Sequence, residues 1–284
     1  MWTAARITLI ASGAVLLARS QYEREQLSVE YTDIVSKKLL KDCTLVFLSD
    51  LHSHQFGKDN RRLIEEIDRI NPDLVLIGGD MMVAKGSFDT KVPLSLLKNL
   101  TRKYPVYYGN GNHENRIKRQ KEIYGTQYEE YVKKIRAMGV VVLEDRTENV
   151  RQDLSVSGID LKESCYEKFG SDQMTKEEIQ EKLGVCEDKR YHIMLCHSPL
   201  SFPACRQWGA DLTLSGHFHG GTIRLPLLGG VMTPQFQFFL PWCAGTFWEE
   251  DSCLLVSRGL GTHSINIRLN NKPQLVAVRL KRSK

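Results

Sequence analysis

Four short apolar runs in the first half of the chain alternate with segments of helical character. The runs cover residues 44–48, 74–77, 105–108 and 140–143. Uninterrupted apolar runs of this length are typical of strands that are buried on both faces. Between the first two runs, apolar side chains at positions 63, 64, 67 and 70 keep helical spacing until Asn71-Pro72 ends the segment. This alternation predicts a mainly parallel sheet covered by helices.

The second half of the chain has a different pattern. Its last three apolar runs follow one another with no helical segment between them, which predicts a second sheet packed on the first. The region between residues 162 and 188 is polar and helix-prone, and we interpret it as an insertion without an assigned chemistry. The strand-like runs of this half are residues 191–195, 211–214, 254–257, 264–267 and 275–278.

Side chains that can bind a metal follow most of these runs directly. Open α/β sheets place their ligand sites just beyond the carboxyl ends of the strands, so these side chains are expected to meet at one edge. Any one of them alone is weak evidence, because an isolated Asp-x-His or a lone histidine is common in proteins. Together and in this order they predict a single site. The residues are Asp50, His52, Asp80, Asn112, His113, His197, His217 and His219.

The densest part of this set is the stretch Gly216–Gly221, which holds two histidines one residue apart between glycines. Glycine lets the backbone bend so that both imidazoles can converge on one small volume. Neutral imidazole is the commonest metal ligand among protein side chains. The alternative interpretation is a glycine-rich turn with incidental histidines.

Composition narrows the class of protein. No linker, repeat or low-complexity run divides the 284 residues, so we expect one domain over residues 27–284. The net charge of +5 fits an anionic substrate or a membrane surface, and without a stripe of basic and aromatic residues we expect no nucleic acid partner. Seven cysteines without a C-x-x-C pair favour reduced thiols. The oligomeric state stays open.

The composition of the N-terminal segment indicates association with a membrane. Residues 7–18 are uncharged and mostly apolar between Arg6 and Arg19. As a helix this stretch would cover roughly 18 Å, short of the ~30 Å hydrocarbon core unless flanking residues are included. We expect residues 1–26 to be a retained membrane anchor and the protein to be membrane-associated, on a side of the membrane that stays open. A cleaved signal peptide, with Ala18-Arg19-Ser20 at the cleavage site, and a buried core helix are the alternatives.

From about residue 43 to 278 the chain resembles the calcineurin-like metallophosphoesterase family. The signature elements of that family are D-x-H, G-D, G-N-H-[ED], H and G-H-x-H. This chain is also similar to a small membrane-anchored branch that includes phosphodiesterases and enzymes that split UDP-2,3-diacylglucosamine. The stretches that carry the resemblance are Ser49–His52, Pro72–Leu74, Gly79-Asp80, Gly111–Glu114, His197, Gly216–Gly221, Arg224–Pro226 and Ser257–Gly261.

The resemblance implies a four-layer αββα sandwich, with two mixed β-sheets flanked by helices and two metals at one edge. It assigns Asp50, His52 and His219 to one metal, and Asp80 to a bridge between the two. The ligands of the second metal would be Asn112, His197 and His217. Mixed nitrogen and oxygen ligands without thiolate point to Mn²⁺, our first candidate, or to Fe or Zn²⁺.

The reaction implied is hydrolysis of a phosphodiester or pyrophosphate bond by in-line attack of a metal-bridging hydroxide. His113 would face the substrate and donate to a phosphoryl oxygen or protonate the leaving group. Two alternatives stay open, a non-catalytic metal-binding scaffold with the same fold and a nucleotide phosphodiesterase or nuclease. A scaffold would be expected to lack ligands, and a nuclease to carry a long basic groove; neither feature is visible.

The substrate is expected to be a phosphate-ester small molecule or a lipid-linked molecule such as UDP-2,3-diacylglucosamine. Aromatic residues between positions 234 and 248 are interpreted either as inter-sheet core or as an apolar wall or membrane-contacting loop. The basic residues at 116, 118, 119 and 121 either attract an anionic substrate or form a solvated helix face. Three histidines lack a matched role: His54 is expected on the surface, His192 in the core and His263 near the pocket.

Overall fold

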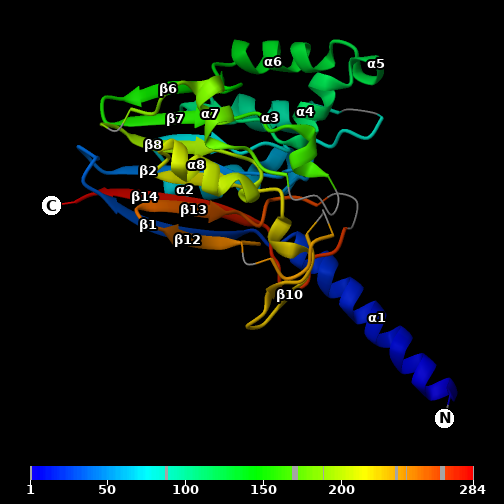
Figure 1. Ribbon diagram of the computed structural model, residues 1–284. Coiled ribbons are helices and arrows are strands. Elements are labelled where there is room, and N and C mark those ends of the chain that lie inside the picture. Colours follow the sequence, from blue (N-terminus) through cyan, green and yellow to red (C-terminus); the bar gives the residue numbers. More distant parts are fainter. Residues whose placement is uncertain are drawn as a thin grey trace.

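Two six-stranded mixed sheets lie face to face, with helices on both outer faces (Figure 1). The computed structural model describes residues 2–86, 89–167, 172–187, 189–233, 236–240, 242–262 and 266–283. The α/β class and the four-layer αββα arrangement expected from the sequence are confirmed.

The first sheet has the strand order β1-β14-β2-β3-β4-β5. The four consecutive strands β2 to β5 run parallel, whereas β14 is antiparallel to β2 and parallel to β1. The four predicted apolar runs correspond to β2 to β5. The bounds are β1 (Ser28–Ser36), β2 (Cys43–Leu48), β3 (Leu74–Ile77), β4 (Val106–Tyr108), β5 (Val141–Val142) and β14 (Gln274–Arg282).

The second sheet has the order β12-β13-β9-β8-β7-β6, with parallel inner strands and an antiparallel strand at each edge. The strand predicted at 264–267 falls partly outside the described residues, and Asn266 and Ile267 have no strand structure. The bounds are β6 (Arg146–Arg151), β7 (Leu154–Gly158), β8 (Tyr191–Leu195), β9 (Leu212–Ser215), β12 (Gly245–Glu249) and β13 (Ser252–Val256).

Helices cover the outer face of each sheet, and short segments connect them. The first sheet is covered by α2 (Arg61–Ile70), α3 (Lys91–Leu100), α4 (Asn112–Arg119), α5 (Lys121–Tyr124) and α6 (Gln127–Ala137). The second is covered by α7 (Lys176–Leu183) and α8 (Phe202–Trp208). The 3₁₀ segments are η1 (Lys58–Asn60), η2 (Glu163–Tyr166), η3 (Pro199–Ser201) and η4 (His219–Gly221), and a small hairpin joins β10 (Arg224–Leu225) to β11 (Gly229–Gly230).

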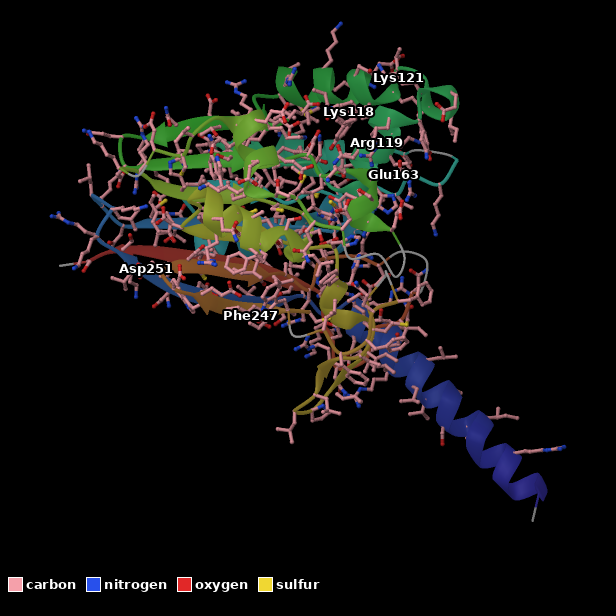
Figure 2. All side chains as sticks on the ribbon, in the orientation of Figure 1. Lys118, Arg119, Lys121, Glu163, Phe247 and Asp251 are labelled. Carbon is pink, nitrogen blue, oxygen red and sulfur yellow. The ribbon has the colours of Figure 1, made fainter. Side chains whose placement is uncertain are left out.

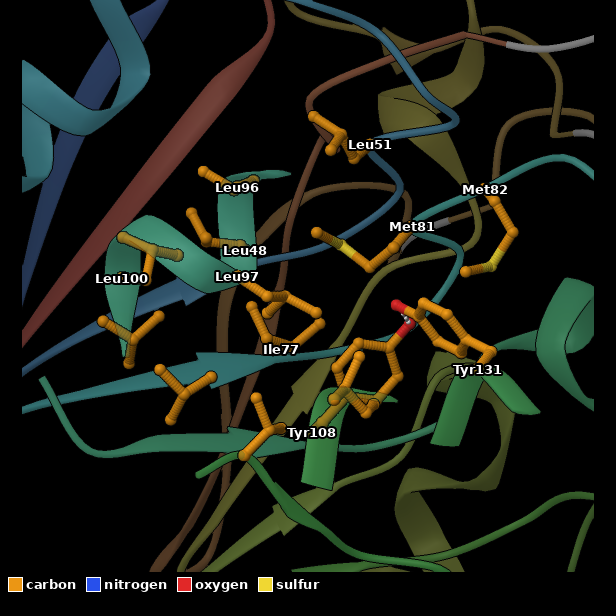
Figure 3. Packing of buried hydrophobic residues seen from close by; sticks show 14 of the residues in the cluster. Leu48, Leu51, Ile77, Met81, Met82, Leu96, Leu97, Leu100, Tyr108 and Tyr131 are labelled. Carbon is orange, nitrogen blue, oxygen red and sulfur yellow. Dashed lines mark hydrogen bonds between the residues drawn. The ribbon is translucent and has the colours of Figure 1, made fainter. Parts of the chain in front are cut away.

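The alternation of side chains along each strand separates the cores. In β2, Val46 and Leu48 pack against the helices, whereas Leu45 and Phe47 pack against the second sheet. Figure 3 shows the helix side of the first sheet, where Leu48 lies among leucines of α3. Because both faces are covered, the parallel strands of the first sheet are almost fully apolar, and the polar residues lie in the loops at the strand ends.

The helix α1 (Trp2–Arg24) extends away from the body (Figure 1). It contains the apolar segment 7–18, but among the described residues no helix is both long and apolar enough to cross a membrane. The anchor therefore stays a prediction. At the other end of α1, Ser20 and Glu23 are buried and accept hydrogen bonds from the backbone N–H groups of Arg268 and Asn271, at 2.9 and 3.0 Å.

Candidate metal centre

Loops from both sheets meet at the edge where β2, β3, β8 and β9 end. Three overlapping groups of buried side chains there have ligand atoms within 4.8 Å of one another. Asn112, which begins α4 immediately before His113, has a buried Oδ1. All eight residues singled out in the sequence therefore lie in this region, seven of them in the close groups. The groups are Asp50, His52 and His219; His52, Asp80 and His113; and Asp80, His197 and His217.

The loops turn sharply, which places the side chains toward one another. Five ligand candidates have φ between 47° and 65°, a left-handed conformation that is uncommon for residues other than glycine. They are Asp50, His52, Asp80, His217 and His219. Backbones also approach side chains closely: a Cβ added at Gly216 would lie 2.2 Å from Asp50 Oδ2, and one at Gly111 would lie 2.3 Å from Asp80 Oδ1. Glycine is required at both positions for steric reasons.

Asp50 and His219 define one side of the centre. The Nε2 atom of His219 lies 3.6 Å from Asp50 Oδ1 and 3.1 Å from His52 Nε2. Asp50 also accepts hydrogen bonds from Ser49 Oγ and from the backbone N–H of His217, at 2.6 and 3.0 Å. These contacts join the end of β2 in the first sheet to the loop after β9 in the second.

Asp80 lies between the two sides. Its Oδ2 is 3.3 Å from His197 Nε2, 3.8 Å from His52 Nε2 and 4.0 Å from His113 Nε2. Its Oδ1 accepts a hydrogen bond from the backbone N–H of His113 at 2.8 Å. One carboxylate oxygen is therefore within 4.0 Å of three histidines, which together come from all three groups. A ligand that bridges two cations needs such an arrangement.

Unsatisfied polar atoms indicate that the residues fit cations. Among the described residues, Asp80 Oδ2 and Asn112 Oδ1 are buried and accept no hydrogen bond. A buried acceptor without a donor is costly, and a carboxylate more so. The set of nitrogen and oxygen donors suits two divalent cations without selecting Mn²⁺, Fe or Zn²⁺. The assignment of each ligand to one metal stays a prediction.

Backbone carbonyl groups set the tautomers of His197 and His219. His197 Nδ1 lies 2.6 Å from the carbonyl oxygen of Gly78, and His219 Nδ1 lies 3.2 Å from that of Gly261. A carbonyl only accepts, so each Nδ1 donates, and the Nε2 atoms turn toward the carboxylates. In the neutral form of both imidazoles, the lone pair is therefore on the Nε2 atom that faces the carboxylates.

His113 has the opposite arrangement. The backbone N–H of Ala84 donates to its Nδ1 at 2.9 Å. In the neutral ring Nε2 must then carry the proton. Since this Nε2 points toward Asp80 Oδ2, His113 presents a donor to the centre rather than a lone pair. The role of His113 toward the substrate stays a prediction.

Burial and neighbouring charges shift the pKa values of Asp50, Asp80 and His197 in different directions. Burial raises the pKa of Asp50 to about 6. Burial also acts to raise the pKa of Asp80, but His197 and the other nearby imidazoles outweigh it and hold this pKa well below its usual range. For His197, burial lowers the pKa while the two carboxylates raise it, with a net value of about 10. Cation binding would therefore displace protons from imidazole.

Glu114 is a supporting residue to which the sequence analysis gave no role. Its two carboxylate oxygens accept from the backbone N–H groups of Asp80, Met81 and Gly111 at 2.8–3.0 Å, and from the Tyr108 hydroxyl at 2.7 Å. Burial and the charge of Asp80 raise its pKa to about 7. A sequence signal existed, because a glutamate three residues after a helix N-cap is typical of a capping box.

The basic residues after His113 divide into two kinds. Lys118 forms ion pairs with Asp160 and Glu144 at 2.9 and 3.0 Å, and Lys121 pairs with Glu129 at 2.6 Å. In contrast, no ion pair of Arg116 or Arg119 occurs within the described part of the chain. Both arginines line a pocket beside Asn112.

The aromatic segment also divides. Trp242 packs against Phe202 of α8, with ring centroids 5.9 Å apart, as part of a small core. Phe238 and Phe239 are exposed, at 58% and 54%. The core interpretation therefore applies to Trp242, and the exposed-loop interpretation applies to the two phenylalanines.

The three remaining histidines lie outside the close groups or outside the described structure. His192 is buried in β8, as expected, and lies 2.7 Å from Ser155 Oγ. His54 is less exposed than expected and packs against the ring of Phe56 at 4.6 Å. His263 lies outside the described residues.

Comparison with known proteins agrees with the site. The family model described as "Calcineurin-like phosphoesterase" matches residues 43–221, which is more than half of the chain. The uncharacterized protein YpbG of Bacillus subtilis is 27% identical over 245 residues, covering 84% of this chain and 80% of the relative. Phosphodiesterase YaeI of Escherichia coli is 24% identical over 241 residues, covering 83% of this chain and 81% of the relative.

A further relative differs in length. A transmembrane protein with metallophosphoesterase domain from Danio rerio is 25% identical over 257 residues, covering 86% of this chain but 54% of the relative. The family model covers the strand ends that supply all eight site residues. With its buried aspartate and histidine groups at those strand ends, this chain belongs to the calcineurin-like phosphoesterase family of hydrolases.

Proposed function

We propose that the protein hydrolyses a phosphodiester or pyrophosphate bond with two divalent cations bound at the Asp80 edge. The observation that supports this most directly is the position of Asp80 Oδ2, buried within 4.0 Å of histidines from both groups and without a hydrogen-bond donor among the described residues. When bound, a pair of cations supplies an activated water and neutralises charge on the phosphoryl group. We favour Mn²⁺, with Fe or Zn²⁺ as alternatives.

Each residue of the site then has a stated task. Asp50, His52 and His219 hold one cation, and Asn112, His197 and His217 hold the other, with Asp80 shared. The Nε2–H of His113 donates to a phosphoryl oxygen or to the leaving group. Such a positioned acid typically contributes about 10²–10⁴-fold in rate. The intact set of ligands favours this function over a non-catalytic scaffold.

The finer proposal is a lipid-linked substrate. Apolar side chains are exposed in the region after the double-histidine turn: Leu227 and Leu228 between β10 and β11, and Phe238 and Phe239 beyond them. In Figure 1 the β10 hairpin projects from the same end of the molecule as α1. Acyl chains buried against such side chains would contribute about 0.8 kcal/mol per CH₂. Residues 7–18 and this region would together hold the protein at a membrane.

The catalytic proposal is tested by loading the metal-free full-length protein with Mn²⁺, Zn²⁺ or Fe²⁺. We expect two equivalents of metal per chain and hydrolysis of bis(p-nitrophenyl) phosphate. Two equivalents bound without turnover of any phosphate monoester, diester or diphosphate would instead favour the scaffold.

The lipid proposal is tested with a double substitution, Phe238→Ser and Phe239→Ser. We expect the wild type to prefer diacylated substrates over their deacylated forms, and the double variant to lose this preference while keeping aryl diester hydrolysis. Trp248→Ser is the control, since Trp248 is similarly exposed at 54% but lies in edge strand β12. Equal preference in the wild type and the double variant would contradict the lipid proposal and leave the catalytic one intact.

A further inference from the structure

A pocket of about 190 Å³ opens beside the metal centre. Its lining comes from α4 on one side and from η2 with the residue that follows on the other. Figure 2 shows Arg119 and Glu163 of these two segments on the same side of the molecule. The region that the sequence analysis treated as an insertion without chemistry thus forms one wall. The lining residues are Asn112, Arg116, Arg119, Glu163, Tyr166 and Glu167.

Tyr166 connects this pocket to the metal centre. Its ring lies 5.0 Å from the ring of His217 and 6.0 Å from that of His197. Its hydroxyl oxygen is buried and has no hydrogen-bond partner among the described residues. A buried hydroxyl without a partner is destabilising, and a ligand oxygen that accepts its proton would offset this cost.

The two arginines face the pocket with unused donors. Arg116 donates one hydrogen bond to the Ala84 carbonyl at 3.2 Å, and Arg119 one to the Leu161 carbonyl at 3.3 Å. Each guanidinium has five N–H donors, so donors remain for a ligand. Glu163 and Glu167 are exposed, where water screens their charge.

We propose that this pocket binds a second oxyanion of the substrate, next to the phosphoryl group that is cleaved. This rests on the proposed phosphoesterase function and specifies its substrate class: an ester with a second phosphate or a carboxylate close to the phosphoryl group that is cleaved. The volume is below the ~300 Å³ of ordinary ligand pockets, so it accepts a small polar group and excludes acyl chains.

The test compares bis(p-nitrophenyl) phosphate, which has no second acidic group, with UDP-glucose, which has a second phosphate. A third arm uses a p-nitrophenyl phosphodiester whose other ester group carries a carboxylate. The double variant Arg116→Ala and Arg119→Ala should raise KM for a substrate that uses the pocket by about 10–100-fold, the range for hydrogen bonds to charged groups. KM for the plain diester should change less than about twofold. The control Lys121→Ala should leave every value unchanged.

The outcomes separate the pocket from the catalytic proposal. A wild type that cleaves the plain diester but gains nothing from a second acidic group would overturn the pocket assignment alone. Equal losses on all substrates in the double variant would overturn it as well. A wild type that cleaves none of them with any metal would contradict the proposed function itself.

A second and independent observation concerns the end of α1. The Asn271 side chain donates from Nδ2 to the backbone carbonyl of the ligand candidate His219 at 2.7 Å, while the Asn271 backbone N–H donates to Glu23 Oε2 at 3.0 Å. Both Asn271 and Glu23 are nearly fully buried, at 1% and 4% exposed. Two hydrogen bonds therefore join α1 to the loop of one metal ligand.

Arg268 makes a parallel connection. This fully buried side chain donates from Nη2 to the Gly261 carbonyl at 2.7 Å, the same carbonyl that faces His219 Nδ1. Its own backbone N–H donates to Ser20 Oγ of α1 at 2.9 Å. Burial lowers its pKa to about 9, so it stays charged at neutral pH. The orientation of the His219 ring thus depends on a segment that α1 holds in place.

We infer that Glu23 and Asn271 are positioning residues for the cation held by His219. In full-length protein, Asn271→Ala and Glu23→Ala should weaken one of two Mn²⁺ binding steps about 10-fold in isothermal titration, as the loss of residues that orient a metal ligand commonly does. Glu23→Gln keeps an acceptor and should restore it. Tyr22→Ala, on the exposed face of the same turn, is the control.

A purely structural role would lower the melting temperature but leave both binding steps of the folded protein unchanged, and that result would overturn the inference. Equal weakening of both steps would overturn it as well. If Asn271→Ala does not fold, the Glu23→Ala and Glu23→Gln pair carries the same test.

Discussion

The backbone around His197 and His219 differs from the backbone around His113 in a way that separates two roles. The rings of His197 and His219 lie next to carbonyl oxygens, those of Gly78 and Gly261. The ring of His113 lies next to a backbone N–H, that of Ala84. The same side chain therefore offers a lone pair to the centre in one region and a proton in the other. Chemistry at this edge is decided by neighbouring peptide groups as much as by the histidines.

The two regions also differ in what supports them. Gly78 directly follows β3 and its N–H donates to the Leu48 carbonyl at the end of β2 at 2.8 Å, so the partner of His197 is joined to the sheet. Gly261 belongs to an irregular segment that Arg268 holds. Ala84 lies on the loop after β3. We therefore expect the His197 ring to be the more rigid of the two. We expect the His219 ring to be the more sensitive to changes far away in the chain.

Asp80→Asn should remove the difference between the two regions by disabling both, because His197 and His113 both lie within 4.0 Å of this carboxylate. We expect loss of both metals and of turnover, since an amide cannot bridge two cations as a carboxylate does. Metal content by elemental analysis and the rate on an aryl diester are the measurements. Two bound equivalents with wild-type turnover would show that Asp80 is not the bridge.

His113→Ala and His197→Ala should separate the two roles. The first should keep most of the metal and lose about 10²–10⁴-fold in rate, less with nitrophenolate as leaving group than with an alkyl alcohol. The second should lose one metal equivalent. Equal rate losses of His113→Ala on both leaving groups would argue against proton donation by His113.

Gly216→Ala should affect the Asp50 side of the centre and Gly111→Ala the Asp80 side. We expect both effects on metal binding to be weaker than that of Asp80→Asn. The added methyl group would meet Asp50 in the first variant and Asp80 in the second, at 2.2 and 2.3 Å. Overpacking of this kind costs about 1–3 kcal/mol, and we expect Gly216→Ala to weaken one Mn²⁺ step and Gly111→Ala to weaken both. Gly13→Ala is the control, since no atom lies within 4 Å of its added Cβ and it does not have a positive φ. Metal affinities equal to the control would contradict this.

The sequence was sufficient for the parts of the fold that repeat a simple pattern. Strands buried on both faces, such as β2 and β3, are uninterrupted apolar runs, and the rule that parallel strands end at a common edge brought the ligand candidates together. β7 was missed because its alternate residues are serines, although all of it is buried. Ser155 and Ser157 pair with His192 and Thr147 instead, at 2.7 and 2.8 Å.

Other features had no local signal. β1 is an edge strand with charged residues along it, and its partner β14 lies at the far end of the chain. The contact between Glu23 and Asn271 joins residues 248 positions apart. The tautomer of His113 depends on Ala84, 29 positions away. Such pairings arise from the packed structure, and no spacing in the sequence indicates them.

The left-handed turns at the ligands have a consequence for the history of such a protein. Each of the five residues with φ between 47° and 65° holds a conformation that costs an L-residue about 1–2 kcal/mol, and glycine would adopt it freely. Selection for stability alone would therefore favour glycine at these positions. Under the proposed function, cation binding is the advantage that keeps aspartate and histidine there. In a lineage that abandoned catalysis, glycine substitutions at Asp50 or His217 should be among the earliest traces.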